Sequence, residues 1–335
     1  GNDKGVMLCN RTFAGAAAAA KAGAGLEVGG SGKAFLSGAV PKPHGSNVPI
    51  ASREINPAVA NREKKVTALH RHKQWLSELQ GTKDDLEGFL EGCDLLIHLA
   101  SAHDHLNDEE MRAVNIGGTE ALIAEAERCG HSGSSGFEMW VVSSAVIGAP
   151  VYSYYRDTKR IQEKLIRGCG INWTSFRPTL VYGKGDMRHT APLLRKCAQE
   201  KGTIWVPHDG KSMINPVHVD DVVDAVMRFF DFERGVDCCY ELAGPEGIPY
   251  NRFLDATISA VEGRVRRRNI SKTWADRLIF LKGLFTDVTE DRRASAYFML
   301  HHEHNITNAV EELGWTPRSY DEGIREVASG DWWRE

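Results

Sequence analysis

The chain lacks long hydrophobic runs, an excess of basic charge and paired cysteines. No stretch of about 18 apolar residues occurs, so the sequence offers no helix that would span a bilayer. The formal net charge of −4 argues against a nucleic-acid partner held by a basic surface. The seven cysteines are scattered and have no Cys-x-x-Cys spacing, which indicates reduced thiols. We therefore expect an intracellular protein, located in the cytoplasm or, as the alternative, in mitochondria.

The histidines also lack the spacing of a metal site. Two His-rich pieces occur, His-Asp-His at 103–105 and His-His-Glu-His at 301–304. Neither has a second pair of ligands at the separation that zinc sites use, so we expect surface histidines and no metal. His98 stands alone in an apolar strand-like run and is interpreted as a structural residue.

What the sequence does have is a regular alternation of short apolar runs and helical patterns. Residues 1–32 are Ala/Gly-rich and of low complexity, and we expect a flexible tail there. From Lys33 onward, strand-like runs are separated by patterns typical of amphipathic helices, such as Glu109–Cys129. The expected strands are Lys33–Ser37, Lys65–His70, Cys93–Ala100, Glu138–Ser143 and Trp173–Arg177.

This alternation predicts the α/β class, with a doubly wound parallel sheet of the Rossmann type. We expect residues 33–178 to form this dinucleotide-binding domain. Beyond residue 178 the alternation becomes irregular. We expect residues 179–335 to form a smaller lobe, interleaved with the first domain, that binds a small-molecule substrate.

Tyr155 and Lys159 form the strongest local pattern. Ser144 stands at the end of an expected strand, and Tyr155 follows it by eleven residues. Lys159 comes four residues after Tyr155, so the two side chains share one face of a helix. A nearby ammonium stabilises the phenolate and lowers the pKa of tyrosine from its ordinary value of about 10. A serine hydroxyl at the strand end can hold a carbonyl or alcohol oxygen beside that phenol. The three residues therefore predict proton transfer coupled to hydride chemistry at a carbon–oxygen centre.

Five further segments carry a family resemblance. They are “DDLEGFLEGCDLLIHLAS”, “NIGGTEALIAEA”, “FRPTLVYGKGD”, “INPVHVDDVVDAV” and “NAVEELGWTPRSYDEGIRE”. In this order they resemble the extended short-chain dehydrogenase/reductase family, the NAD(P)-dependent epimerase/dehydratase group. The resemblance extends from Lys33 to Glu326. It implies a nicotinamide cofactor that lies across the carboxyl edge of the sheet.

The resemblance also implies a catalytic set. Tyr155 would be the general acid/base, and Lys159 would hold the nicotinamide ribose and tune Tyr155. Ser144 would orient the substrate, with Ser143 as the alternative. Asn115 would support this set.

The same resemblance places Ala100 and Pro178 beside the cofactor and assigns the phosphate loop to “GAVPKPHG”, from Gly38 to Gly45. The first and last glycines of the family pattern are present, but two prolines interrupt the loop. Each proline removes a backbone N–H that would otherwise bind phosphate. The loop is therefore expected to be a degraded or unusual version of the family's phosphate loop.

Arg71 bears on the choice of cofactor. It follows the second expected strand, and no acidic residue stands there to meet a ribose 2′-hydroxyl. An arginine at this place favours the 2′-phosphate of NADP, with NAD as the alternative. A solvated surface arginine is the competing interpretation.

These patterns support three hypotheses. The first is an NAD(P)-dependent oxidoreductase that reduces a carbonyl or oxidises a secondary alcohol. The second is a non-catalytic, NADPH-binding or scaffold subunit of a larger assembly, of the type found as an accessory subunit of respiratory complex I. The third is a sugar-nucleotide epimerase or dehydratase. A homodimer and a place in a larger complex both stay open.

Overall fold

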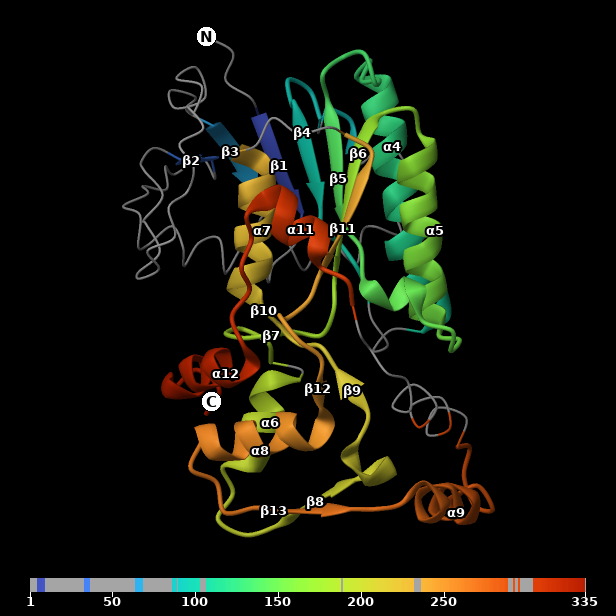
Figure 1. Cartoon of the computed structure of the whole chain (residues 1–335). Helices are drawn as coiled ribbons and strands as arrows, with labels where there is room; N and C mark the ends of the chain where they lie inside the picture. Colours follow the sequence, from blue (N-terminus) through green and yellow to red (C-terminus); the bar gives the residue numbers. More distant parts are fainter. Residues whose placement is uncertain are drawn as a thin grey trace. The chain divides into compact units, whose positions relative to one another are not determined.

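The computed structural model describes residues 5–9, 33–36, 64–68, 86–88, 90–102, 107–187, 189–231, 236–288, 292, 295 and 304–334 (Figure 1). The chain divides into two units that alternate along the sequence. The first comprises Gly1–Ser143, Thr158–Ser175 and Glu233–Cys238. The second comprises Ser144–Asp157, Phe176–Phe232 and Cys239–Glu335.

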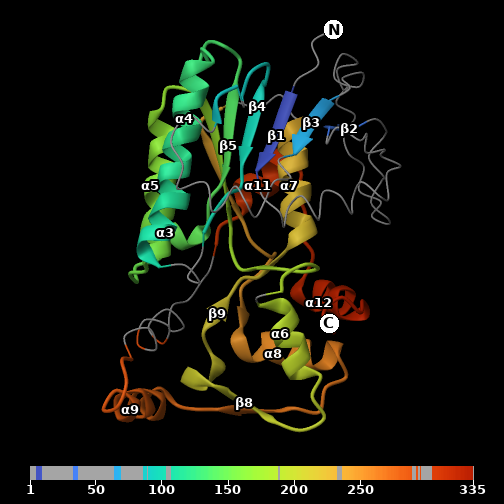
Figure 2. The same ribbon diagram turned by 180° about the vertical axis from the view of Figure 1, so that it is seen from behind.

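A seven-stranded sheet carries the α/β fold that the alternation predicts (Figures 1 and 2). In spatial order it consists of β11 (Cys238–Leu242), β6 (Asn172–Pro178), β5 (Glu138–Val142), β4 (Leu95–His98), β1 (Gly5–Cys9), β3 (Lys64–Ala68) and β2 (Lys33–Leu36). The pairings of β1 with β3, of β1 with β4 and of β4 with β5 are parallel. All four residues of β4 are buried, as expected for a parallel strand covered on both faces.

The two N-terminal strands occupy places that the local pattern does not reveal. β1 lies inside residues 1–32, the segment expected to be a tail, and pairs with both β3 and β4. β2 is expected to lead into the phosphate loop, but it is an edge strand antiparallel to β3, with Lys33 opposite Thr67. Strand order depends on pairing between segments that are distant in sequence, which hydrophobic periodicity alone does not encode.

The helical segment after β4 begins with a capping box. The side chain of Asn107 accepts a hydrogen bond from the backbone N–H of Glu110, whose carboxylate accepts one from Asn107. The segment confirms the predicted helix and consists of α3 (Asp108–Arg112), a π-helical turn (Ala113–Gly117) and α4 (Gly118–Arg128). Figures 1 and 2 show α4 beside α5 (Tyr154–Gly168) against the sheet.

The second unit has a hydrophobic core of its own. Phe253 stacks on Tyr320 with ring centroids 4.5 Å apart, and Leu194 and Trp333 belong to the same buried cluster. The helices of this unit are α6 (Thr190–Cys197), α7 (Val219–Asp231), α8 (Tyr250–Ala260), α9 (Lys272–Lys282), α11 (Thr307–Leu313) and α12 (Tyr320–Ser329). Its short strands are β7 (Val181–Tyr182), β8 (Thr203–Val206), β9 (Met213–Ile214), β10 (Val217–His218), β12 (Ile248–Pro249) and β13 (Arg266–Asn269).

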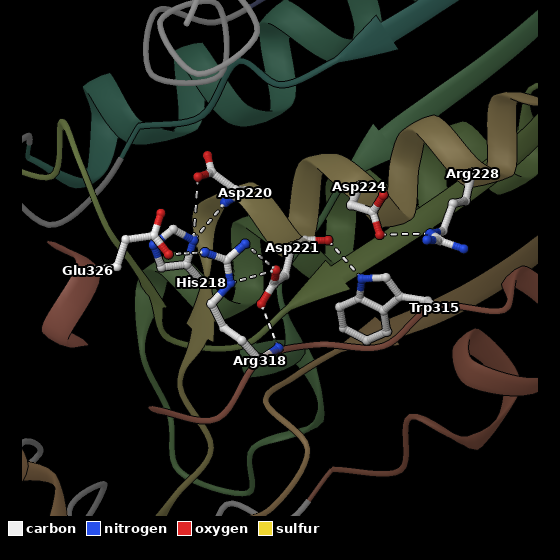
Figure 3. Close-up of polar contacts among 8 residues, drawn as sticks. All are labelled: His218, Asp220, Asp221, Asp224, Arg228, Trp315, Arg318 and Glu326. Atoms are coloured by element: carbon white, nitrogen blue, oxygen red, sulfur yellow. Dashed lines mark hydrogen bonds and ion pairs between the residues drawn. The ribbon is translucent and has the colours of Figure 1, made fainter. Parts of the chain in front are cut away.

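Two of the resembling segments meet in the second unit, around Asp221 at the start of α7 (Figure 3). The carboxylate of Asp221 accepts hydrogen bonds from the backbone N–H of Arg318 at 2.9 Å and from its Nε at 3.0 Å. The indole N–H of Trp315 donates to the backbone oxygen of Asp221 at 2.8 Å. The acidic residue of “VHVDD” and the tryptophan of “LGWTP” are thus parts of one buried connection, and their role here is structural.

No helix within the described ranges is both long enough and apolar enough to cross a membrane.

Candidate active site

Asn115 joins three elements of the first unit near the carboxyl end of β4. Its Oδ1 accepts a hydrogen bond from the backbone N–H of Ala102 at 2.6 Å, and its Nδ2 donates to the Ala102 oxygen at 3.1 Å. The same Nδ2 donates to Oγ1 of Thr158 in α5 at 3.0 Å. Asn115 is fully buried in the π-helical turn. The asparagine therefore connects the chain after β4, where the half-buried Ala100 lies, to the helix that carries Lys159.

Lys159 is a fully buried ionisable group of the first unit. Its side chain is 1% exposed. The amine donates to the backbone oxygen of Val142 at 3.0 Å and to the side-chain oxygen of Gln162 at 2.5 Å. Burial disfavours the charged form and lowers the pKa of Lys159 to about 7, although the carboxylate of Glu163 acts in the opposite direction. The amine can therefore change protonation state close to neutral pH.

Gln162 and His98 extend this arrangement from α5 to β4. The amide nitrogen of Gln162 donates to Oγ1 of Thr119 in α4 at 3.0 Å and lies 3.0 Å from Nε2 of His98. Nε2 of His98 lies 2.9 Å from Oγ1 of Thr119. Burial, together with the positive charge of Lys159, lowers the pKa of His98 to about 3, so the imidazole is neutral. His98, Thr119 and Gln162 form a buried polar network behind Lys159.

Sequence reasoning overlooked Gln162. It lies three residues after Lys159 and four before the fully buried Ile166, on the inward face of an amphipathic helix. A glutamine at such a position needs hydrogen-bond partners in the core. That mismatch between residue type and helix face is the signal that could have pointed to it.

Two serines follow β5. Ser143 belongs to the first unit and is buried, and its hydroxyl finds no hydrogen-bond partner within the part of the chain that the structure describes. Ser144 belongs to the second unit and caps the 3₁₀ turn Ala145–Gly148, where its Oγ accepts from the Val146 N–H at 3.3 Å. A buried hydroxyl without a partner is costly, so Ser143 has spare capacity to bind a ligand.

Tyr155 lies in the first turn of α5, half-buried. The neighbouring Arg156 is buried and donates from Nη1 to the backbone oxygens of Ala149 at 3.1 Å and Val151 at 2.7 Å. These bonds tie the short connection after Ser144 to the beginning of α5.

The cofactor residues expected from the sequence divide into two groups. Pro178 ends β6 and is buried. Gly38, Gly45 and Arg71 lie outside the described residues.

The two His-rich pieces also lie outside the described residues, apart from His304, whose Nδ1 lies 3.1 Å from a carboxylate oxygen of Glu241. Among the described residues, no group of three or more His, Cys, Asp or Glu side chains is arranged to hold a metal ion.

Comparison with known proteins decides the family. Residues 44–238, more than half of the chain, match the family described as “NAD dependent epimerase/dehydratase family”. The chain belongs to this family. Membership agrees with the expectation drawn from the five segments.

Curated relatives of the family align over part of their length. The chain is 27% identical over 174 residues to short-chain dehydrogenase/reductase family 42E member 1 of Bos taurus, covering 42% of this chain and 43% of that protein. It is 28% identical over 149 residues to the ceramide reductase of Caulobacter vibrioides (strain NA1000 / CB15N), covering 44% of each. The chain thus spans less than half the length of these relatives.

Solved structures of similar fold cover more of the chain. RMD from Pseudomonas aeruginosa, complexed with NADPH, superposes with a TM-score of 0.59 at 16% identity, covering 81% of this chain and 91% of that one. UDP-glucuronic acid 4-epimerase from Bacillus cereus, in complex with UDP-glucuronic acid and NAD, has a TM-score of 0.58 at 13% identity, with coverages of 80% and 82%. At these identities the likeness establishes the Rossmann-type fold.

Proposed function

We propose that this protein is an NAD(P)-dependent oxidoreductase that reduces a carbonyl group or oxidises a secondary alcohol. One observation carries the proposal: Lys159 is buried one helical turn after Tyr155 on α5, with its pKa lowered to about 7. Perturbed ionisable groups of this kind cluster at functional sites. Membership of the NAD-dependent family supplies the hydride chemistry that such a tyrosine–lysine pair serves.

The residues around Lys159 fit the nicotinamide ribose. A protonated lysine has three N–H groups, and those of Lys159 serve only Val142 and Gln162 among the described partners. The remaining donor suits a ribose hydroxyl. The hydroxyl of Ser143, which has no hydrogen-bond partner among the described residues, lies at the carboxyl end of β5, the sheet edge where such folds bind dinucleotides. The donor set therefore matches a polyhydroxylated ligand.

The other end of the cofactor is assigned by the family pattern. We propose Gly38 and Gly45 for the diphosphate, Arg71 for the 2′-phosphate, and Ala100 and Pro178 as neighbours of the bound dinucleotide. NADP is the proposed cofactor, and NAD is the alternative. Bound at this site, the cofactor would supply or accept a hydride.

The chain's own residues would handle the proton. We propose that Tyr155 donates its phenolic proton to the carbonyl oxygen during reduction. During oxidation its phenolate would accept the proton of the alcohol hydroxyl. Lys159 would lower the pKa of Tyr155, and Ser144, or Ser143 as the alternative, would hold the substrate oxygen. Asn115 would keep α5 in register with the chain after β4 through Thr158 and Ala102.

The experiment is cofactor binding followed by turnover. Quenching of tryptophan fluorescence by NADPH, and weaker quenching by NADH, is the expected result. Turnover is then measured on a panel of aldehydes and ketones with wild type, Tyr155→Phe and the adjacent control Tyr154→Phe. A loss of about 10²-fold or more is expected for Tyr155→Phe alone. Equal turnover of all three proteins would overturn the role of Tyr155.

A second candidate is an epimerase or dehydratase acting on a sugar nucleotide. The family match itself favours it, and a structure of similar fold is a UDP-glucuronic acid 4-epimerase. The same tyrosine would then serve a transient oxidation. Release of an epimer from a UDP-sugar, without net consumption of cofactor, would select this candidate over the first.

A non-catalytic subunit predicts a different pattern. It would bind NADPH, turn over neither carbonyls nor UDP-sugars, and show no effect of Tyr155→Phe. Light scattering of the purified chain would determine whether it forms a homodimer. Its elution volume when an extract of its source is separated by size would determine whether it joins a larger assembly. Three measurements, of cofactor binding, turnover and molecular mass, therefore distinguish the three candidates.

A further inference from the structure

α9 and the turn after it expose a set of large apolar side chains. We call it the α9 patch, and it consists of Trp274, Leu278, Phe280, Leu281, Leu284 and Phe285. Within it, Trp274, Leu278 and Leu281 follow at i, i+4 and i+7 and therefore lie along one helix face. The exposed fractions run from 52% at Leu278 to 87% at Phe285. So many exposed large apolar side chains on one helix and the turn after it indicate an interaction site.

A neighbouring face of α9 holds the helix to its own unit. Ala275 is buried and Ile279 is half-buried, and α9 contacts the turn Pro207–Gly210. A Cβ atom built on Gly283 would lie 2.9 Å from the buried side chain of Val288, so the chain after the helix is also closely packed. The helix is therefore anchored through Ala275 and Ile279, and the exposed apolar side chains of the α9 patch take no part in that core.

Charge around the α9 patch differs from that of the whole chain. The chain carries a net charge of −4. Residues 266–285 contain Arg266, Arg267, Arg268, Lys272, Arg277 and Lys282 and one carboxylate, that of Asp276. Arg267 forms an ion pair with Asp255, and Lys272 forms one with Asp276. The guanidinium of Arg277 lies over the ring of Trp274, 5.3 Å from its centroid. On the adjacent strands, the exposed Trp205 is in register with the exposed Arg268. Basic side chains thus lie beside exposed aromatic rings both on α9 and on the β8–β13 pair.

We infer that the α9 patch docks the protein on the surface of an anionic lipid bilayer. Leucine, phenylalanine and tryptophan side chains enter the boundary between headgroups and acyl chains, while lysine and arginine meet the negative headgroups. A second copy of this chain fits less well, because it would bring the same cationic segment against this one. The inference does not depend on the proposed reaction, and binding to lipid needs no cofactor.

The test is co-sedimentation with vesicles of phosphatidylcholine alone and of phosphatidylcholine mixed with phosphatidylserine. Wild type is expected to bind the mixed vesicles more tightly than vesicles of phosphatidylcholine alone. This difference is expected to become smaller at high salt. The triple variant Phe280→Ser/Leu284→Ser/Phe285→Ser is expected to bind about tenfold more weakly or worse. The double variant Arg277→Glu/Lys282→Glu should lose the preference for phosphatidylserine.

Two controls keep the result interpretable. Met227→Ser changes an exposed apolar residue of α7, 39% exposed, and should bind like wild type. Thermal unfolding of each variant verifies that it is folded. The inference is overturned if wild type binds neither kind of vesicle, or if the triple variant binds as well as wild type. A wild-type dimer that the triple variant abolishes would assign the patch to self-association instead.

Discussion

The amine of Lys159 donates a hydrogen bond to the side-chain oxygen of Gln162, three residues later on the same helix. The amide of Gln162 in turn donates to Thr119, and it lies 3.0 Å from His98. Gln162, which is not part of the family's catalytic pattern, therefore positions the amine of Lys159. Because both groups are buried, small chemical changes at Gln162 should act directly on the protonation of Lys159.

Substitution of Gln162 should change the pKa of Lys159. Gln162→Leu removes an acceptor that stabilises the ammonium, so the pKa should fall below about 7. Gln162→Glu places a carboxylate beside the amine, so the pKa should rise. A lysine side-chain NMR titration measures both. The exposed Gln199→Leu serves as the control, and an unchanged titration of Lys159 in both Gln162 variants would contradict the prediction.

His98 should make the protein less stable in acid. Its pKa is about 3 in the folded chain, against an ordinary value of 6.5, so between these values the unfolded chain binds a proton that the folded chain does not. The free energy of unfolding should therefore fall as the pH drops from 6.5 towards 3, by at most about 1.4 kcal/mol per pH unit for this group. His98→Asn should flatten that slope in urea titrations, whereas the exposed His189→Asn should leave it unchanged.

Lys159 should change the stability of the protein at alkaline pH. Its pKa is about 7 when folded and 10.5 ordinarily, so between these values the unfolded chain again binds the additional proton. The contribution of Lys159 to stability should rise from pH 7 to 10.5, with a slope of at most about 1.4 kcal/mol per pH unit. Lys159→Met should remove this slope, as determined from unfolding curves of both proteins. Parallel curves across this pH range would refute it.

Arg318 should be more important for stability than a surface arginine. Arg318→Ala would leave the buried carboxylate of Asp221 without its charged partner, at a cost of about 3 kcal/mol. The matched control is Arg252→Ala, because Arg252 forms exposed ion pairs with Glu246 and Asp321. That change should cost about 1 kcal/mol or less. Chemical denaturation measures both, and equal costs would show that burial of Asp221 is not decisive.

The sequence predicts only part of the candidate site. The helical segments that carry Asn115 and Tyr155 are predicted by their apolar spacing, which is local. The place of Asn115 between Ala102 and Thr158 is not, because those residues are 13 positions before it and 43 after it. The helix face of Gln162 is a local signal, but its partner His98 could not be predicted for the same reason, since it is 64 positions away.

What the sequence by itself determined is the α/β class, the helix that carries Tyr155 and Lys159, and the family. These follow from periodicity and from short ordered segments, which are properties of neighbouring residues. Only the tertiary structure decided that β1 pairs between β3 and β4, that β2 is the edge strand, and that Lys159 is buried against Gln162. Strand order and the burial of an amine depend on contacts between distant segments, and their free energies exist only once the chain has folded.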